Sequence, residues 1–376
     1  MAASKSSSRT AGKPARLMSL DVFRGATVAF MIIVNTPGTW SHVYAPLRHA
    51  QWHGCTPTDL VFPSFLFISG VAMWYSLRKF NFGFSGASLF RILRRVLLIF
   101  AAGLFLNIFP HFIDRDYNTL RIMGVLQRIA LAWGLGATLV LLIKRNYIWL
   151  ATAVILFGYW ALMYFLGGAD PYSLEGNFAR TVDIAVLGEN HLYKGFGMPF
   201  DPEGLLSTLP ATATVLLGFM AGGLISGSGT SWKTPGWLTL TGALLIGAGL
   251  LWGHYFPINK PIWTSSYVLY AGGIGMIILA LLYVIIDIWN LRGWTGFFNT
   301  FGTNALFTYL LAGIWTKTML AIKIGEGTLY KWIFTNICSP LFEEQKLASL
   351  LFAVIQVMIV WAFGYILYRK KIIIKF

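Results

Sequence analysis

The sequence predicts an all-α, polytopic membrane protein, and its composition and hydropathy support this fold class. Hydrophobic residues make up 56% of the 376 residues and charged residues only 11%, whereas a typical soluble domain carries about 25% charged residues. Apolar runs of roughly 20 residues, the length that a helix needs to cross a bilayer, recur along the whole chain. We therefore expect helices embedded in a lipid bilayer and no soluble domain.

Hydropathy and length together predict about ten transmembrane helices. Their expected positions are 17–37, 58–77, 89–110, 121–143, 147–166, 206–226, 235–255, 266–289, 300–322 and 347–368. One transmembrane domain, residues 17–369, is then flanked by tails at 1–16 and 370–376. Two long connections, 167–205 and 324–346, are expected on one face.

The distribution of lysine and arginine orients these spans. Of the 29 basic residues, 17 fall on segments that share one side with both termini, and nine fall on the other side. The remaining three, Arg24, Arg121 and Arg128, lie at or inside spans. The positive-inside rule places the richer side in the cytoplasm, so both termini are expected there and the long connections outside. Topology thus explains the net charge of +15, and we expect no nucleic-acid partner.

The long connection 167–205 is rich in glycine, proline, acidic and aromatic residues. Carboxylates bind hydroxyl and ammonium groups, and aromatic rings stack on sugar faces, so this composition suits a cationic or sugar-like ligand. Long loops on one face also suggest a lid or a substrate rim. The alternative, which loop composition alone favours, is a structured cap without a ligand role.

The best candidates for chemistry lie at the link between the first two spans. His49 stands at a helix mouth, and imidazole suits general-base catalysis near neutral pH. Asn35 ends the first span, where a carboxamide could orient a substrate or stabilise an oxyanion. Asp59 begins the second span, where a carboxylate suits the positive end of a helix and could orient His49. The alternatives are a loop hydrogen bond for His49 and purely terminal roles for the other two.

Other side chains of the same link have weaker claims. His42 and His53 compete with His49 as the base. Cys55 and Cys338 are the only two cysteines, which is too few for a disulfide framework or a metal cluster, and a single bridge between them is not favoured. Because HExxH and CxxC motifs are absent as well, we expect no metal.

The fourth span carries two arginines that are expected to bind an anion. Arg121 and Arg128 are seven residues apart, which predicts a shared helix face, and Gln127 lies beside them. A buried arginine within a membrane is costly and usually functional, and phosphate or pyrophosphate is its natural partner. The alternatives are an ion pair with a carboxylate such as Asp114 or Asp116, or snorkelling to the membrane surface.

Two more polar residues complete the candidate binding set: Arg24 at the rim of the first span and Asn304 at the start of the ninth. The cluster at the cytoplasmic start of the third span could also touch a nucleotide, although topology explains it equally well; it comprises Arg91, Arg94 and Arg95.

Five segments carry a resemblance to a known family: RLMSLDVFRG, IIVN, HAQWHGCTPTDLVFPSFLFISG, LRIMGVLQRIALAW and FGTNALFTYLL. They resemble the heparan-α-glucosaminide N-acetyltransferases, a family of transmembrane acyltransferases. The similarity is strongest through residues 16–76 and 120–133. The compound pattern H-x-x-W-x-G-x-T-x-x-D-L-V-F-P is long and specific. The chain resembles a compact bacterial member, without the large luminal domain that precedes the spans in the animal enzyme.

The resemblance implies that acetyl-CoA, as co-substrate, donates its acetyl group to the amine of a terminal glucosamine. It implies that His49 is the catalytic histidine and Asn35 the active-site asparagine. Cys55 stands where the family pattern shows an apolar residue, so we expect no nucleophilic thiol there. Arg128, with Arg121 and Gln127, would hold polar groups of CoA. A homodimer in the bacterial inner membrane is also implied.

Several alternatives stay open at this stage. His49 either serves as a general base for direct attack or forms an acetyl-histidine intermediate in a ping-pong scheme. An inner-membrane amino-sugar transporter is the alternative function of a different class. Acetylation of hydroxyl groups on an envelope glycan is a third possibility.

Overall fold

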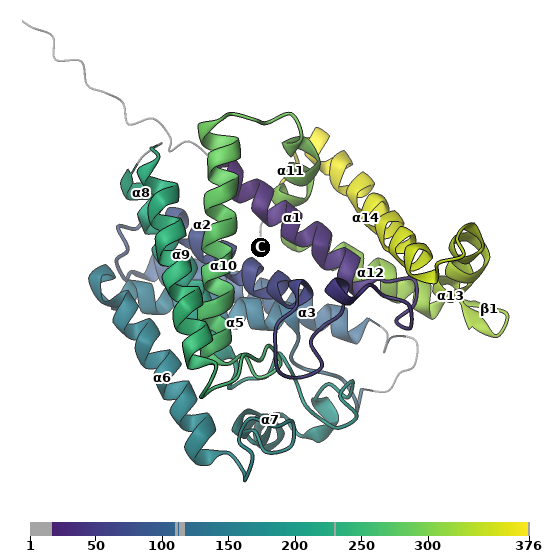
Figure 1. Cartoon of the computed structure of the whole chain (residues 1–376), viewed down its shortest axis with the longest axis horizontal. Coiled ribbons are helices and arrows are strands. Elements are labelled where there is room, and N and C mark those ends of the chain that lie inside the picture. The colour runs from purple at the N-terminus through teal and green to yellow at the C-terminus, as the bar shows by residue number, and fades with distance from the viewer. Residues whose placement is uncertain (1–16, 110–111, 113–116, 229–230, 375–376) are drawn as a thin grey trace, which may run out of the picture.

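The computed structural model describes residues 17–109, 112, 117–228 and 231–374, and the regular secondary structure within these ranges is almost entirely helical (Figure 1). Within these ranges, eight helices are long and apolar enough to cross a membrane. The prediction of an all-α polytopic membrane protein is therefore confirmed. The eight are α1 (Met18–Asn35), α2 (Val61–Arg78), α5 (Val125–Leu142), α6 (Ile148–Leu166), α8 (Thr208–Ser228), α9 (Lys233–Trp252), α10 (Ser265–Tyr283) and α14 (Gln345–Arg369).

Two of the ten predicted spans differ from these eight. Helix α3 (Gly86–Ile108) is long, but it carries three arginines near its start, and charged side chains belong at an aqueous surface. The predicted span 300–322 was wrong as one continuous helix, because the chain leaves helical geometry at Asn304, with φ −128° and ψ 40°. It forms α11 (Thr295–Thr303) and α12 (Ala305–Ala321) instead.

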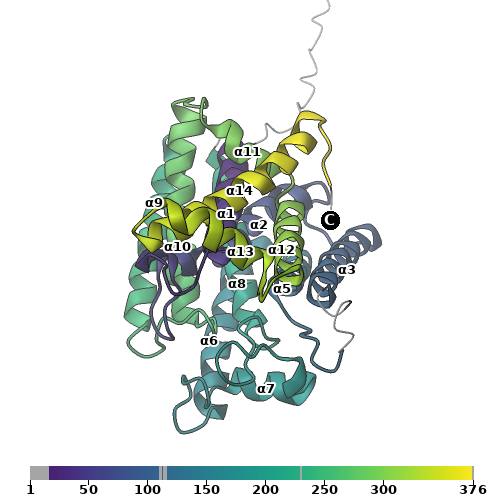
Figure 2. The ribbon, with the colours of Figure 1, turned by 90° about the vertical axis from the view of Figure 1, so that its right-hand side faces the viewer.

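Four connections meet at one end of the helices, which we call the loop-rich end: residues 36–60, 117–124, 167–207 and 253–264. The backbone N–H of Gly54 donates to the carbonyl oxygen of Ile258 at 2.7 Å, and that of Ile122 donates to His191 at 3.2 Å. Helix α7 (Phe178–Leu187) lies at this end and α11 at the opposite end (Figure 2). Candidate residues from distant parts of the sequence are thereby brought together.

Glycines let α2 and α8 cross at close range. A methyl group on Gly70 would lie 1.9 Å from the carbonyl oxygen of Val215, and one on Gly218 would lie 1.9 Å from that of Phe67. Small residues at helix contacts allow such backbone approach within a membrane. The crossing fixes α2, and with it the short 3₁₀ helix η2 (Pro57–Leu60) that precedes it.

The long connection 167–205 is folded onto the neighbouring loops. The side chain of Asn177 caps α7 by accepting a hydrogen bond from the backbone N–H of Arg180 at 2.8 Å. The indole of Trp52 donates to the carbonyl oxygen of Tyr172 at 2.8 Å. The connection therefore forms a structured cap over the link that carries His49.

The connection between α12 and α14 contains the only sheet within the described ranges. Strand β1 (Lys323–Ile324) pairs antiparallel with β2 (Gly327–Thr328), with Lys323 opposite Thr328. The hydroxyl of Tyr330 donates to the carbonyl oxygen of Pro37 at 2.6 Å, which ties this connection to the end of α1. The remaining short helices are η1 (Ala45–Leu47), η3 (Arg145–Tyr147), η4 (Glu189–His191), η5 (Val284–Ile288), α13 (Leu329–Ile333), η6 (Phe334–Cys338) and η7 (Ser339–Leu341).

Candidate active site

The imidazole of His49 is held by a buried carboxylate. Nδ1 of His49 lies 2.6 Å from Oδ1 of Asp59. The Asp59 side chain is only 2% exposed, whereas that of His49 is 43% exposed. Because an ionised carboxylate only accepts hydrogen bonds, Nδ1 carries the hydrogen and Nε2 keeps its lone pair. The open side of the ring therefore presents a base.

The local sequence explains how Asp59 reaches this position. Thr56 and Asp59 form a capping box at η2, with Pro57 in its first turn. Oδ2 of Asp59 accepts from the backbone N–H groups of Ala50 and Thr56, each at 3.0 Å, and from the Thr56 hydroxyl at 3.0 Å. The two roles considered for Asp59, capping and contact with His49, thus occur together.

Lys260 stands in the same cluster, and sequence reasoning missed it. Its Nζ lies 3.2 Å from Nδ1 of His49 and 3.5 Å from Oδ1 of Asp59. Burial lowers the pKa of Lys260, and the negative charge of Asp59 opposes that effect. The residue lies 211 positions after His49, and on sequence it counted only toward membrane topology. A lone cation between two spans, in the segment PINK, was the available signal.

The other candidates at the end of α1 and in the link that follows it do not contact Asp59. Asn35 is exposed at the end of α1, and its carboxamide has no hydrogen-bond partner among the residues that the structure describes. His42 is also exposed. His53 contacts Asn259, whose Nδ2 lies 3.3 Å from its Nδ1, and burial lowers the pKa of His53. Of the three histidines in this link, His49 is the one bonded to a carboxylate.

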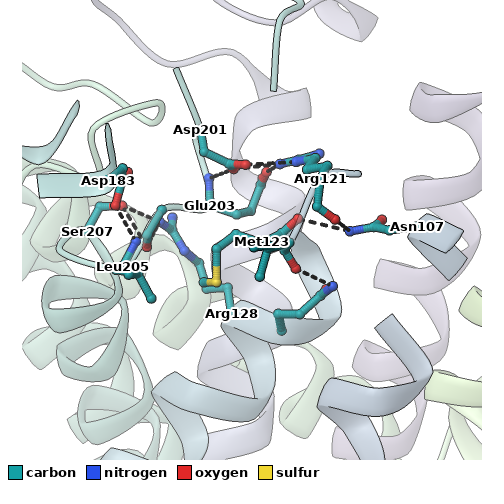
Figure 3. Close-up of polar contacts among 12 residues, drawn as sticks. Asn107, Arg121, Met123, Arg128, Asp183, Asp201, Glu203, Leu205 and Ser207 are labelled. Atoms are coloured by element: carbon teal, nitrogen blue, oxygen red, sulfur yellow. Dashed lines mark hydrogen bonds and ion pairs between the residues drawn. The ribbon is translucent and has the colours of Figure 1, made fainter. Parts of the chain in front are cut away.

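Arg121 was wrongly predicted to share a helix face with Arg128. Helix α5 begins at Val125, because the preceding Gly124 is extended, with φ 169°. Arg121 instead donates to both carboxylate oxygens of Asp201, at 2.9 and 2.7 Å, and to Glu203 at 2.5 Å (Figure 3).

An ion pair with a carboxylate is therefore the contact that Arg121 makes. Burial alone would lower the pKa of Arg121, but the bonds and charges of Asp201 and Glu203 outweigh it and raise that pKa. The partners are not those considered from the sequence, since Asp114 and Asp116 lie outside the described residues.

Arg128 is fully buried at the loop-rich end. Its Nη2 donates to the carbonyl oxygen of Gly204 at 3.1 Å and contacts the hydroxyl of Ser207, while its guanidinium lies 5.0 Å from the ring centre of Trp263. Its Nε and Nη1 have no hydrogen-bond partner within the described ranges. Gln127 is buried and donates to a backbone carbonyl at 2.9 Å. Whether these side chains also contact an acyl donor stays a prediction.

Asp183 and Arg128 hold the turn at residues 204–207 from two sides (Figure 3). Oδ1 of Asp183 accepts from the backbone N–H of Leu205 at 2.7 Å. A methyl group on Gly204 would lie 1.7 Å from Oδ2 of Asp183, so this position requires glycine. Burial raises the pKa of Asp183 to about 7.

The raised pKa of Asp183 predicts a pH-dependent stability. The folded protein holds a proton that the unfolded chain releases above about pH 4. The stabilising contribution is complete below that pH and is lost as pH rises through about 7. Asp183→Asn keeps an acceptor for Leu205 but cannot titrate. Between about pH 5 and about pH 8, its melting temperature should therefore fall less than that of the wild type.

The matched control for this experiment is Asp170→Asn, since Asp170 is an exposed carboxylate on the same connection. Its melting temperature should follow the wild type at both pH values. If the melting temperatures of Asp183→Asn and wild type fell equally, the Asp183 carboxyl would not be the titrating group.

Arg24 and Asn304 line one cavity of about 260 Å³ that lies nearer the opposite end. Nη1 of Arg24 donates to Asp21 at 3.0 Å. The Asn304 carboxamide binds the end of the described chain: it donates to the carbonyl oxygen of Ile372 at 2.9 Å and accepts from the N–H of Ile374 at 2.8 Å.

A neighbouring cavity of about 350 Å³ shares Arg95 with the first. The Arg95 guanidinium lies 4.2 Å from the ring centre of Trp133, and its Nε has no hydrogen-bond partner within the described part of the chain. The basic residues that line this second cavity are Lys79, Arg91, Arg94 and Arg95.

One face of α2 lines both cavities, and the first turn of this helix lies at the loop-rich end. Phe65, Ser69 and Ala72 line the first cavity and Ser76 lines the second; this spacing places all four side chains on one helix face. Asp59 lies in η2, directly before α2, and six positions before Phe65.

The family model described as heparan-alpha-glucosaminide N-acetyltransferase, catalytic, matches residues 16–249. The chain is 27% identical to human heparan-alpha-glucosaminide N-acetyltransferase, over 98% of this chain and 61% of the human protein. It is 26% identical to the mouse protein of that name, over 96% of this chain and 60% of the mouse protein. The chain thus spans about 60% of the length of these curated relatives.

Proposed function

The chain belongs to the heparan-α-glucosaminide N-acetyltransferase family, and from this membership we propose that it transfers the acetyl group of acetyl-CoA to the amine of glucosamine or of a glucosamine-terminated sugar. The observation that carries the proposal is the hydrogen bond between His49 and Asp59. It leaves Nε2 of a half-open imidazole available as a base. Both residues lie within the matched region.

The chemistry follows from the groups around His49. Nε2 of His49 takes a proton from the acceptor nitrogen, whose lone pair attacks the thioester carbonyl carbon. The carboxamide of Asn35, which is exposed at the same end, donates to the oxyanion that forms. When the carbon–sulfur bond breaks, the CoA thiolate leaves and takes the proton from His49. Asp59 keeps the ring in the required tautomer throughout.

The basic cavities suit the acyl donor. Arginine binds phosphate groups in a bidentate manner, and Arg24 and Arg95 line one cavity. The pantetheine arm would run along the face of α2 that lines the two cavities, from Ser76 toward Phe65, and present the thioester to His49. From the lysine and arginine distribution we expect this basic side, with both termini, to face the cytoplasm. The bacterial inner membrane implied by the family resemblance stays a prediction. The homodimer implied by the family resemblance stays a prediction.

Two substitutions test the donor site. In Arg24→Ala and Arg95→Ala, the KM for acetyl-CoA should rise about tenfold while kcat changes less than about twofold, because each loses a charge-assisted contact that is made before and during the reaction. Initial rates at varied acetyl-CoA concentration measure both constants. Arg78→Ala is the matched control: its guanidinium lies 3.4 Å from Ser226 Oγ, and Arg78 lines neither cavity. An unchanged KM in both variants would contradict this assignment of the donor site.

The proposed function is tested by incubating purified protein with labelled acetyl-CoA and glucosamine. Labelled N-acetylglucosamine is the expected product. Uptake of glucosamine into proteoliposomes without acetyl-CoA would favour a transporter instead, and acetylation of sugars that lack an amine would favour O-acetyl transfer. Release of CoA without an acceptor would replace direct attack by an acetyl-histidine intermediate.

A further inference from the structure

We propose that Lys260 is a positioning residue for the base: its ammonium group holds Asp59 in place and opposes retention of a proton by His49. This inference rests on the proposed acyl transfer, because it assigns a role within the same site. It starts from one juxtaposition. Nζ of Lys260 lies 3.5 Å from Oδ1 of Asp59 and 3.2 Å from Nδ1 of His49.

The distances among His49, Asp59 and Lys260 show which nitrogen carries the ring hydrogen. The separation between His49 Nδ1 and Asp59 Oδ1 is only 2.6 Å, so the ring N–H points to the carboxylate. An ammonium group has donors and no acceptor, so Lys260 cannot bond to Nδ1 in this tautomer. It shares Oδ1 with the ring and adds a positive charge directly beside it.

The backbone holds Lys260 at this place. The loop that carries it pairs with the loop that carries His49, since the N–H of Gly54 donates to the carbonyl oxygen of Ile258 at 2.7 Å. The carbonyl oxygen of Lys260 accepts from the N–H of Trp263 at 3.0 Å. Trp263 is buried and has φ +50°, a left-handed conformation that a bulky residue adopts only when its surroundings enforce it.

Four other groups bear on the charge at this site. Asp59 is the anion bonded to the ring. Burial raises the pKa of the Cys55 thiol to about 12, so Cys55 is neutral. The guanidinium of Arg48 donates to the carbonyl oxygen of Ser41 at 3.2 Å. Glu203, which interacts electrostatically with Lys260, is paired with Arg121. Among the described residues, Lys260 is therefore the cation that touches the ring.

This arrangement affects how readily His49 passes a proton from the acceptor amine to the CoA thiolate. Asp59 alone would stabilise the imidazolium and hold the proton on the ring. The adjacent ammonium opposes that state, so the ring returns its proton to the CoA thiolate. Without Lys260, the ring should stay protonated to a higher pH, and the base should be lost at neutral pH.

Lys260→Met and Lys260→Arg test this role through the pH profile of kcat/KM. The acid limb of Lys260→Met should move up by about one pH unit, which gives an activity about tenfold below wild type near pH 6.5 and within about twofold of it near pH 8.5. Lys260→Arg keeps the charge and should restore the wild-type limb. Lys194→Met, which removes an exposed lysine of the connection 167–205, is the control. A uniform loss at all pH values would reduce Lys260 to a structural role.

A second measurement does not depend on turnover. Diethyl pyrocarbonate modifies neutral imidazole, so the extent of His49 modification against pH, followed by peptide mass spectrometry, reports the protonation of the ring directly. Its midpoint should rise in Lys260→Met, and coincident curves for Lys260→Met and wild type would overturn the inference. A shifted midpoint in a protein that transfers no acetyl group would refute the proposed function while leaving the role of Lys260 intact.

Discussion

Replacing His49 by glutamine should lower kcat by about a thousandfold, because general-base catalysis contributes between about 10² and about 10⁴. Glutamine is of similar size and polarity, and the backbone N–H groups of Ala50 and Thr56 still donate to the Asp59 carboxylate, so the carboxylate stays hydrogen-bonded. It cannot accept a proton from the acceptor amine. The loss should therefore fall on kcat at saturating substrate and leave the melting temperature close to that of the wild type.

His42→Gln is the matched control, since His42 is an exposed histidine of the same link without a bond to Asp59. It should keep wild-type turnover. If His49→Gln retained more than about a tenth of the wild-type kcat, His49 would not be the base. Labelled acetyl groups recovered on His49 in wild-type protein would instead identify this histidine as a nucleophile.

The second large effect should follow from Asp59→Asn, which is expected to lower kcat by at least about a hundredfold. An amide NH₂ facing Nδ1 of His49 would act as a donor, so the ring hydrogen would move to Nε2. Nε2 would then face the acceptor already protonated, so it could not act as the base. The variant also leaves the Lys260 ammonium, 18% exposed, without its carboxylate, so some loss of stability should accompany it.

The double variant separates this explanation from simple unfolding. Because His49 and Asp59 act as one unit, His49→Gln with Asp59→Asn should be no slower than His49→Gln alone. Additive losses would show that Asp59 contributes in some way other than orienting the ring. Melting temperatures of all three variants identify any that fail to fold.

Local sequence was sufficient to predict the helices, and it offered contact with His49 as one of two roles for Asp59. Transmembrane hydropathy is a strong, local signal, and each predicted span overlaps a helix, although the span 300–322 is interrupted at Asn304. The pair lies within one short link, where the Thr56–Asp59 capping box fixes the carboxylate. Ten positions separate the two residues, so no information from a distant segment was needed.

Contacts between distant segments could not be predicted in the same way. Lys260 reaches His49 only because two loops pair through Gly54 and Ile258, and one sequence carries no pattern for that pairing. Arg121 was predicted to lie on a helix because the residues around it are apolar. In the structure Gly124 is extended, so α5 begins only at Val125. Its partner Asp201 lies 80 positions away. The composition of the connection 167–205 suggested a lid or a substrate rim and gave no sign of this ion pair.

We propose that the donor reaches His49 from the side of the basic cavities and that the acceptor reaches it from the opposite side of the membrane. Proteoliposomes with protein in one determined orientation test it, with acetyl-CoA confined to one compartment and a membrane-impermeant amino sugar confined to the other. We predict N-acetylated sugar in the compartment that faces His49, and only when acetyl-CoA is in the compartment that faces Arg24 and Arg95. Product formed only when both substrates share one compartment would contradict the claim.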